Sequence, residues 1–454
     1  MDLQAHDRAA TEVTREPSAC VFRPVQYLGC KLRSLTAIVD AITDIAPPSG
    51  RAVDLFTGTS VVAQGLAVRG HQVVALDVMG YSATFARATL GVDRPERWSD
   101  IRDTASVVCN TPEPAWYEPW LDWALEEELA IATADGDALL AQAVELPQIW
   151  RPAGASRAQL AQFARLSSQA GHDVAPAVGI ASSHYAGTYF GIRQALELDR
   201  MRAAIASLRK TQDIDSWSEA ALLTALLSAA SACAFSAGKH FAQAHRIRDG
   251  KDKTFLRQRV VADRSRDVRE VFAGRLDELL KVACPPGEKH AVIQAPFETW
   301  RSEMLEDIDV VYADPPYTAQ QYSRFYHVLE VLVTNRVPLL QRVRGEVTRG
   351  LYPEGRFLSR FCSKRAAVAA FTDLLELVDD LGAGLVLSYS ASKTGSTGND
   401  RMISLNELLV ACTDRLSPKR VRLVELGHVY RQFNQEASAV QDRADGEYLI
   451  ICDA

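Results

Sequence analysis

The feature that most constrains this chain is Asp314-Pro315-Pro316-Tyr317, which follows directly on the apolar run at residues 310–313. A short buried strand brings such a motif to the carboxyl edge of a sheet, where open α/β folds bind their ligands. The two prolines fix φ and remove two N–H donors, so the neighbouring carbonyls are held stiffly. Asp314 and a proline carbonyl can then both accept hydrogen bonds from one exocyclic amine, while Tyr317 offers a ring for stacking. The motif therefore predicts a site for a flat heterocycle that carries an amino group. A strand followed by a rigid turn is the simpler alternative.

A second motif lies far upstream, where residues 52–56 are typical of a buried strand and residues 57–60 of a small-residue turn. Residues 61–68 then have the apolar spacing of a helix. A glycine turn at a helix N-terminus can cradle a polar or anionic group through its free N–H groups and the helix dipole. The next apolar run, 72–76, ends at Asp77, about twenty residues after the glycine, where an acid can bind ribose hydroxyls. The turn lacks the three-glycine dinucleotide fingerprint, which disfavours a nicotinamide cofactor.

A third patch precedes both motifs. Tyr27-Leu28-Gly29-Cys30-Lys31 forms a turn that leads into the amphipathic stretch 32–45. Lys31 beside a glycine turn could bind a carboxylate by a charge-assisted hydrogen bond. An ordinary helix start with a solvated lysine is the alternative.

Taken in order, the chain carries Tyr-x-Gly-x-Lys, Asp-x-Phe-x-Gly-x-Ser, an acid after the second strand, a long insert and Asp-Pro-Pro-Tyr. This order resembles the DNA adenine-N6 methyltransferases whose cofactor region comes first, target recognition second and catalytic motif third. In that family the early motifs bind S-adenosylmethionine and the late motif holds the flipped adenine. The resemblance covers residues 22–95 and 290–454 and extends through the stretch 320–330 and the strand 385–390.

Carried over by position, the resemblance implies roles for individual residues. Lys31 would lie near the methionine carboxylate of the cofactor, Asp77 would hold its ribose, and the Asp-Pro-Pro-Tyr motif would hold the target base. The implied cofactor-binding residues are Tyr27, Lys31, Asp54, Phe56, Gly58, Ser60, Asp77 and Gln294, and the implied catalytic residues are Asp314, Pro315, Pro316 and Tyr317.

Two of these positions depart from the family pattern. Ser60 stands where many members have a second glycine, and we expect it to narrow the room for the cofactor. The family often places an acid after a third strand to contact the cofactor's adenine, and the nearest candidate here is Gln294, which follows the run 291–293.

The net charge of −7 is unusual for a DNA-binding protein, but the charge is segregated along the chain. Residues 110–150 hold nine acids and no Lys or Arg. Residues 239–275 hold eleven Lys/Arg against five acids, and residues 336–365 hold eight against two, a net of +6 for each segment. Such segments can neutralise phosphates, although a solvated helix face is the alternative. The predicted nucleic-acid-binding residues are Tyr322, Arg324, Arg342, Arg344, Arg349, Lys239, Arg246 and Arg248.

Residues 100–289 are predicted to be mainly helical, with a capping box at Ser216-x-x-Glu219. The small, polar and aromatic stretch 182–190 is expected to be a loop that either contacts bases or packs on its own domain.

After the catalytic motif, Tyr322, Tyr326 and Glu330 are spaced by four and should share a helix face, with His327 beside it. One or both tyrosines could close the target pocket, or they could pack in the core. His327 is not needed as a base, because the amine loses its proton during or after methyl transfer.

Composition favours a soluble cytoplasmic enzyme. The chain is 47% hydrophobic and 24% charged, and none of its apolar runs approaches the ~20 residues that cross a membrane. The eight cysteines are scattered, which favours reduced thiols over a zinc site or a disulfide framework. Residues 1–20 lack an apolar secretory core and are expected to form a flexible tail.

The predicted fold is α/β, a class I S-adenosylmethionine-dependent (Rossmann-like) sheet with a largely helical inserted domain. Its strands are expected at 52–56, 73–76, 310–313, 385–389, 421–425 and 448–452. The predicted units are a tail at 1–20, a cofactor-binding part at 21–99, a helical target-recognition insert at 100–289 and a catalytic part at 290–454.

The predicted function is methylation of the N6 amine of adenine in double-stranded DNA, within a restriction-modification or phage-defence system. A separate restriction or defence subunit would then be a partner, and neither a metal nor a membrane is expected to take part. An RNA base N-methyltransferase and a non-catalytic nucleic-acid-binding member are the alternatives.

Overall fold

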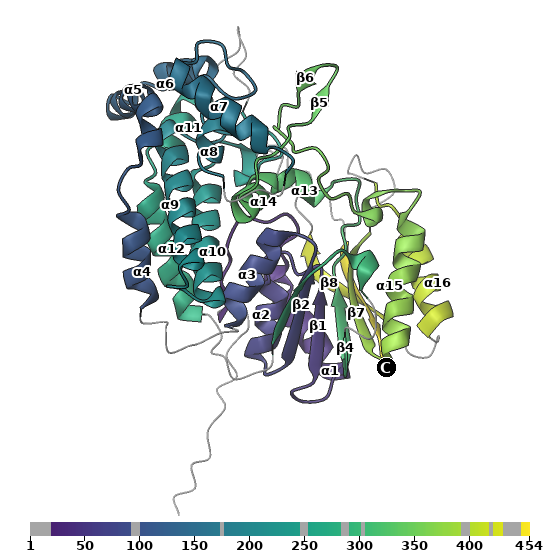
Figure 1. The fold of residues 1–454 in the computed structure, drawn as a ribbon. Helices are drawn as coiled ribbons and strands as arrows, with labels where there is room; N and C mark the ends of the chain where they lie inside the picture. Colours follow the sequence, from purple (N-terminus) through teal and green to yellow (C-terminus); the bar gives the residue numbers. More distant parts are fainter. Residues whose placement is uncertain are drawn as a thin grey trace, which may run out of the picture.

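The computed structural model describes residues 20–91, 100–172, 177–245, 253–282, 290–300, 305–391, 400–416, 421–429 and 446–454. The predicted tail before residue 20 lies outside these ranges, as do the predicted DNA-contacting residues Arg246 and Arg248. Figure 1 shows a twisted sheet between layers of helices, with a further group of helices beside it.

Seven strands of the described chain form one sheet in the order β3-β2-β1-β4-β7-β9-β8. The first five of these are parallel, whereas β9 is antiparallel to both β7 and β8. The six strands predicted from the sequence are confirmed, with ends that differ by a few residues. The bounds are β1 Arg51–Leu55, β2 Gln72–Asp77, β3 Ala291–Gln294, β4 Val310–Ala313, β7 Gly384–Ser390, β8 Val421–Val429 and β9 Gly446–Cys452.

The central strands β1, β4 and β7 are buried on both faces, which is why they are almost continuously apolar. Alternate residues of β1 belong to different cores: Ala52 packs with α1 and α2, and Val53 packs with α15. The helices of the two layers and the segments after β4 are α1 Leu35–Ile45, α2 Val61–Val68, α3 Gly80–Leu90, α13 Tyr322–Phe325, α14 His327–Thr334, α15 Ala367–Leu381 and α16 Leu405–Leu416. A two-stranded hairpin, β5 Arg342–Val343 and β6 Glu346–Val347, projects away from the sheet in Figure 1.

The described part of residues 100–289 is helical, as predicted. Its helices are α4 Ile101–Cys109, α5 Leu121–Ala132, α6 Gly136–Glu145, α7 Arg157–Gln169, α8 Ile180–His184, α9 Ile192–Lys210, α10 Ser216–Cys233, α11 Thr254–Arg264 and α12 Val268–Val282. Short 3-10 turns occupy η2 Lys31–Arg33, η4 Ala115–Trp120, η5 Ala237–Lys239, η6 Phe297–Thr299 and η8 Arg360–Cys362. None of the helices in the described ranges combines the length and apolar character needed to cross a bilayer.

These helices are joined to the sheet by buried contacts. The indole Nε1 of Trp217 on α10 donates to the carbonyl of Ala88 on α3, at 3.1 Å. The guanidinium of Arg202 on α9 donates to the carbonyls of Leu332 and Val333 at the end of α14. The helical segment therefore packs on α3 and α14, which lie next to the carboxyl edge of the sheet.

Two local predictions in this segment need correction. Helix α10 is capped by Asp215, whose side chain accepts from the N–H of Ser218, so Ser216 is the first helical residue and not the cap. The stretch 182–190 begins with the last residues of α8, continues as a turn instead of being a loop throughout, and is buried: Tyr185 and Tyr189 are 0% exposed, and the hydroxyl of Tyr189 donates to the carbonyl of Phe241 at 2.6 Å. Packing on its own domain is confirmed for this stretch, and a role in base contact is excluded by its burial.

Candidate active site

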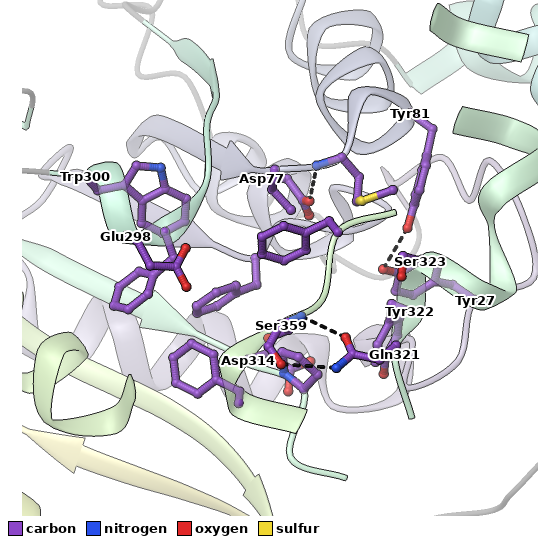
Figure 2. A pocket seen from close by; sticks show the side chains of 17 residues that line it. Tyr27, Asp77, Tyr81, Glu298, Trp300, Asp314, Gln321, Tyr322, Ser323 and Ser359 are labelled. Atoms are coloured by element: carbon purple, nitrogen blue, oxygen red, sulfur yellow. Dashed lines mark hydrogen bonds between the residues drawn. The ribbon is translucent and has the colours of Figure 1, made fainter. Parts of the chain in front are cut away.

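A cavity opens at the carboxyl edge of the sheet, where β1, β2, β3 and β4 end (Figure 2); with the open solvent at its mouth included, the space between its atoms is about 760 Å³. The strand order reverses between β1 and β4, and a reversal of this kind opens a crevice in which open α/β folds bind ligands. The cavity is lined mainly by aromatic rings with a few carboxylates and amides, as small-molecule sites commonly are.

The loop after β1 is shaped by residues that do not themselves line the cavity. Asp54 is 1% exposed, and its Oδ2 accepts from the Thr57 hydroxyl at 2.7 Å and the Ala63 N–H at 3.0 Å. Burial raises the pKa of Asp54 to about 7, against these hydrogen bonds. Gly58 has φ +54°, and a Cβ there would meet the ring of Tyr27 at 3.0 Å. Asp54 and Gly58 therefore fix the course of the loop.

Ser60 does not narrow the cavity as expected. It has φ +59°, a left-handed conformation that explains why glycine suits this position. Its Oγ lies 2.9 Å from the Thr89 hydroxyl on α3, so the side chain is directed to the helix layer. In the same loop, Phe56 also has a positive φ of 64° and its ring lines the cavity. Strained backbone of this kind is maintained where the surrounding structure holds it in place.

Asp77 lies in the cavity wall at the end of β2. Its Oδ2 accepts from the Gly58 N–H at 3.0 Å. Its Oδ1 accepts from the Met79 N–H at 2.9 Å, the bond drawn at Asp77 in Figure 2. Burial raises its pKa. Each carboxylate oxygen can accept a further hydrogen bond, so Asp77 holds two loops together and remains able to bind a hydroxyl.

Glu330 of α14 lies outside the cavity lining but holds the start of α3, which follows Asp77, in place. Its two oxygens accept from the N–H groups of Gly80 and Tyr81 at 3.1 and 3.2 Å, so it caps the first turn of α3. The sequence placed Glu330 on a face with Tyr322 and Tyr326 but gave it no role. The helix is interrupted at Tyr326, which has φ −125° and ψ 17°. Tyr322 and Glu330 therefore lie on two different short helices, α13 and α14.

Three tyrosines meet on the side of the cavity that faces α13. The ring of Tyr27 stacks on Tyr326 at 4.6 Å and lies 5.4 Å from Tyr322. The hydroxyl of Tyr326 accepts from the Leu28 N–H at 2.8 Å, which fixes the turn before Lys31. Tyr27 and Tyr322 line the cavity, whereas Tyr326 is buried in the core. Of the two tyrosines after the motif, one therefore lies at the pocket and the other packs in the core.

An aromatic cluster that the sequence reasoning missed lines the opposite side. Phe56, Phe297, Trp300 and Phe361 surround one another with ring centroids 5.3–5.8 Å apart. Glu298 lies among them in the lining, whereas Gln294 is exposed and outside it. Glu298, four residues after Gln294 and inside the turn η6, is thus the acid that reaches the lining from the segment after the third strand. The signal was present in the run Phe-Glu-Thr-Trp that follows β3.

Two of the four residues of the Asp-Pro-Pro-Tyr motif reach the cavity. Asp314 and Pro316 are in the lining, whereas Pro315 and Tyr317 are buried behind it. The guanidinium of Arg401 lies 5.1 Å from the centre of the Tyr317 ring, and Tyr317 is 7% exposed. Tyr317 therefore anchors the turn and is not open for a ring to stack on.

Below the motif, the amide of Gln321 exchanges two hydrogen bonds with the backbone of Ser359, at 2.8 and 3.1 Å (Figure 2). This pair closes the floor of the cavity by tying the segment after the motif to the turn before η8. Both residues line the cavity, and neither was singled out in the sequence.

The ammonium group of Lys31 contacts the carboxylates of Asp314 and Glu447. Its Nζ lies 3.2 Å from Asp314 Oδ1 and 3.3 Å from Glu447 Oε1, and the residue is 8% exposed. Burial alone would lower the pKa of Lys31, but the facing Asp314 carboxylate and its neighbours raise it above the ordinary value. Burial raises the pKa of Asp314 to about 6, with Lys31 opposing the shift. Lys31 is outside the cavity lining, so its predicted contact with a cofactor carboxylate stays a prediction.

The predicted nucleic-acid-binding residues that the structure describes differ in their exposure to solvent. Arg342, Arg344 and Arg349 are exposed on and beside the β5–β6 hairpin. Arg324 is half-buried, with its guanidinium 5.2 Å from the centre of the Tyr352 ring. Lys239 is a correction: its Nζ donates to Asp263 at 2.7 Å and to the Ala234 carbonyl at 2.8 Å, so it serves as an internal ion pair. Burial lowers its pKa to about 8.

His327 is not at the site. It is 2% exposed, lies among Tyr185, Tyr189 and Tyr352, and has its Nδ1 3.0 Å from the carbonyl of Arg324. Burial lowers its pKa to about 4. A neutral, buried imidazole that faces the helical segment has no path to a proton in the cavity.

The burial of His327 predicts a pH-dependent contribution to stability. Its pKa falls from 6.5 in the unfolded chain to about 4 in the fold, so the unfolded chain binds the extra proton between these values. We expect the free energy of unfolding of the wild type, relative to His327→Gln, to be greatest above pH 6.5 and to decline as the pH falls towards 4. The measurement is urea unfolding at pH 7.5 and pH 5, with the exposed His172→Gln as control. A wild-type advantage that grew on acidification would contradict the burial.

Groups of three or more His, Cys, Asp or Glu side chains that could hold a metal ion are not found in the described ranges. The polar atoms of the cavity belong to carboxylates, amides, hydroxyls and backbone. These groups, among them the carboxylates of Asp314 and Asp77, suit hydrogen bonding to an organic ligand.

No protein-family model matches the chain. Over 155 residues the chain is 29% identical to the type II methyltransferase M.NlaIII of Neisseria lactamica. The match covers 31% of this chain and 42% of that protein, so the chain spans less than half the length of this relative. The similarity supports a methyltransferase, and a sheet of seven mostly parallel strands among many helices is consistent with an α/β methyltransferase fold.

Proposed function

We propose that the protein is an S-adenosylmethionine-dependent methyltransferase of class I that acts on the N6 amine of adenine in double-stranded DNA. The observation that carries the proposal is the shared cavity: Asp314 and Pro316 line it together with Asp77, Tyr27 and Phe56. A cofactor at the ends of β1 and β2 and a base at the end of β4 would then lie side by side. The similarity to a type II methyltransferase supports the same class of reaction.

The residues of the cavity fit the cofactor. Asp77 retains acceptor capacity for ribose hydroxyls, and the rings of Phe56, Phe297 and Trp300 suit a flat adenine. Glu298 would accept from the exocyclic amine of that adenine. When bound, the cofactor supplies a methyl group on a sulfonium centre.

The target base would enter from the side of Asp314. Its amine would donate to Asp314 and to a carbonyl of the proline turn, which the two prolines hold stiffly. Because Tyr317 is covered by Arg401, we assign stacking on the base to Tyr322, whose ring lines the cavity. Extruding a base costs a few kcal/mol, and stacking offsets part of this cost.

Alignment and charge carry the reaction at this site. Asp314 withdraws charge from the amine N–H and orients the nitrogen lone pair, and the amine loses its proton during or after transfer. The aromatic rings of the lining would displace water from the cavity once cofactor and base are bound. Neither His327 nor a metal is assigned a part in these steps.

The remaining assignments concern recognition. We propose that residues 21–99 and 290–454 form the methyltransferase domain and that residues 100–289 recognise the target sequence, with arginines at 324, 342, 344 and 349 as phosphate or base contacts. A restriction-modification or phage-defence system is the setting that this activity fits, with any nuclease on a separate chain.

The test is incubation of the protein with labelled S-adenosylmethionine and unmethylated double-stranded DNA, followed by mass spectrometry of the nucleosides. We expect N6-methyldeoxyadenosine, absent from the Asp314→Ala control. Transfer to RNA but not to DNA would replace the proposal with an RNA base methyltransferase. Nucleic-acid binding without transfer would identify a non-catalytic member.

The hairpin arginines give a separate prediction. Arg344 and Gly345 have φ of 55° and 85°, so they form a turn that accepts Asn at the first position. The double variant Arg342→Ala/Arg344→Asn is expected to bind DNA about tenfold more weakly at moderate salt and to lower the salt slope of binding by about 2. Fluorescence anisotropy over a range of salt concentrations measures both. Arg415→Ala, on α16, is the matched control, and an unchanged slope would remove the hairpin from the DNA interface.

A further inference from the structure

Glu447 lies beside the catalytic acid although 132 residues separate the two in the sequence. It is near the start of β9, opposite Ser390 at the end of β7. Because β9 runs antiparallel to β7, it begins at the edge where the parallel strands end. This reversal brings Glu447 to the edge at which β4 presents Asp314, with Lys31 between the two carboxylates.

The contacts of Glu447 are well defined. Its Oε1 lies 3.3 Å from Lys31 Nζ, and its Oε2 accepts from the Ser34 hydroxyl at 3.2 Å. The carboxylate is 13% exposed and Lys31 is 8% exposed, so solvent screens the pair poorly. Ser34 precedes α1, and the helix start therefore orients Glu447 towards Lys31.

The three charges do not balance. One ammonium group faces two carboxylates, so the cluster of Lys31, Asp314 and Glu447 carries one net negative charge when all three are ionised. Tyr312, Tyr317 and Asp54 are the other titratable groups that act on this cluster. Burial raises the pKa of Tyr312, and Asp54 is directed into its own loop by its hydrogen bonds from Thr57 and Ala63.

We propose that Glu447 is a positioning residue of the methyl-transfer site: by sharing Lys31 with Asp314, it leaves an unbalanced negative charge facing the amine that becomes cationic during transfer. The inference rests on the proposed function. Without Glu447, Lys31 would belong to Asp314 alone and compete with the amine for its oxygens. With Glu447, the lysine is held to one oxygen of Asp314 and the other oxygen remains an acceptor.

The test is Glu447→Gln, which removes the charge and keeps the shape and the acceptor for Ser34. Two quantities are measured: the titration midpoint of the Asp314 carboxyl by ¹³C NMR, assigned with Asp314→Asn, and the pH profile of kcat. We expect the midpoint and the acid limb of the profile to move down by about one pH unit, because a like charge near Asp314 is lost. The plateau of kcat should fall about tenfold while the cofactor Kd is unchanged.

Three further variants sharpen the test. Lys31→Met should move the Asp314 midpoint in the opposite direction, by about 1–3 pH units. Glu447→Asp, which keeps the charge, should restore the midpoint and part of kcat. Glu425→Gln is the matched control, since Glu425 is an exposed carboxylate on β8 paired with Tyr448, the neighbour of Glu447.

A fall in kcat without movement of the midpoint or of the acid limb would overturn the proposal and reduce Glu447 to a structural role. If the wild type transfers no methyl group, the proposed function fails, but the NMR titration still decides whether Glu447 acts on Asp314 through Lys31. If Glu447→Gln does not fold, Ser34→Ala releases Glu447 from its orienting bond. A smaller downward shift of the midpoint is then expected, and its absence would refute the inference.

Discussion

Asp314→Asn is expected to slow methyl transfer about 10³-fold while the affinity for S-adenosylmethionine changes by less than about threefold. Asparagine keeps the shape of Asp314 but loses the charge that draws on the amine N–H. Its amide also presents a donor where Lys31 Nζ already lies 3.2 Å away, so the acceptor oxygen is retained by the lysine. The loss should appear in kcat and not in cofactor binding, because Asp77 and the aromatic cluster are untouched.

Single-turnover transfer to DNA measures the first quantity, and calorimetry with the cofactor alone measures the second. Asp307→Asn is the matched control: this aspartate is exposed in the turn before β4, and its φ of 51° suits asparagine. Retention of more than a tenth of the activity by Asp314→Asn would refute the assignment of the acceptor.

Asp77→Asn is expected to weaken cofactor binding by about 10–100-fold, equivalent to the 1.5–3 kcal/mol of a hydrogen bond to a charged group. Asp77 accepts from Gly58 and Met79 with different oxygens, and asparagine can replace only one of them. The amide nitrogen would then face a backbone donor, so the loops after β1 and β2 must shift. A ribose acceptor is lost at the same time.

Calorimetry in the absence of DNA measures this effect, and thermal unfolding of the cofactor-free variants separates it from a loss of fold. Glu298→Gln provides the comparison, since Glu298 lines the same cavity but belongs to neither loop. We expect a smaller change, of less than about tenfold, for that variant. Wild-type affinity in Asp77→Asn would place the cofactor away from the end of β2.

The sequence determined the strands and the acids that end them. Residues 310–313 and 385–389 are apolar runs of strand length bounded by turn residues. Because these strands are buried on both faces, nearly all their residues are apolar, and a few consecutive residues are enough to recognise each strand. The carboxylates of Asp77 and Asp314 follow their strands directly, so a parallel sheet brings them to one edge. Local patterns also predicted the helical character of residues 100–289.

Other features depended on contacts that no window contains. The sequence did not predict the protein partners of Lys31: β4 presents Asp314 and the antiparallel return of β9 presents Glu447 to its ammonium group. The charge count around Lys239 predicted a phosphate contact, whereas Asp263 neutralises it internally. Sequence charge is a sum over a segment, and only the folded chain decides which charges face one another.

The residues of the cavity wall show most clearly which features the sequence predicted and which only the folded structure decided. The sequence identified Tyr27, Phe56 and Asp77, whose motifs are local. For the position after the third strand it offered Gln294 as the nearest candidate, whereas the side chain in the lining is Glu298 of the turn η6. Likewise, the sequence predicted that Tyr317 stacks on a base, whereas in the structure the guanidinium of Arg401 lies over its ring. Secondary structure and strand-end chemistry follow from the order of neighbouring residues. Which side chain faces the ligand depends on loop paths and on long-range packing, and those are settled only when the whole chain is folded.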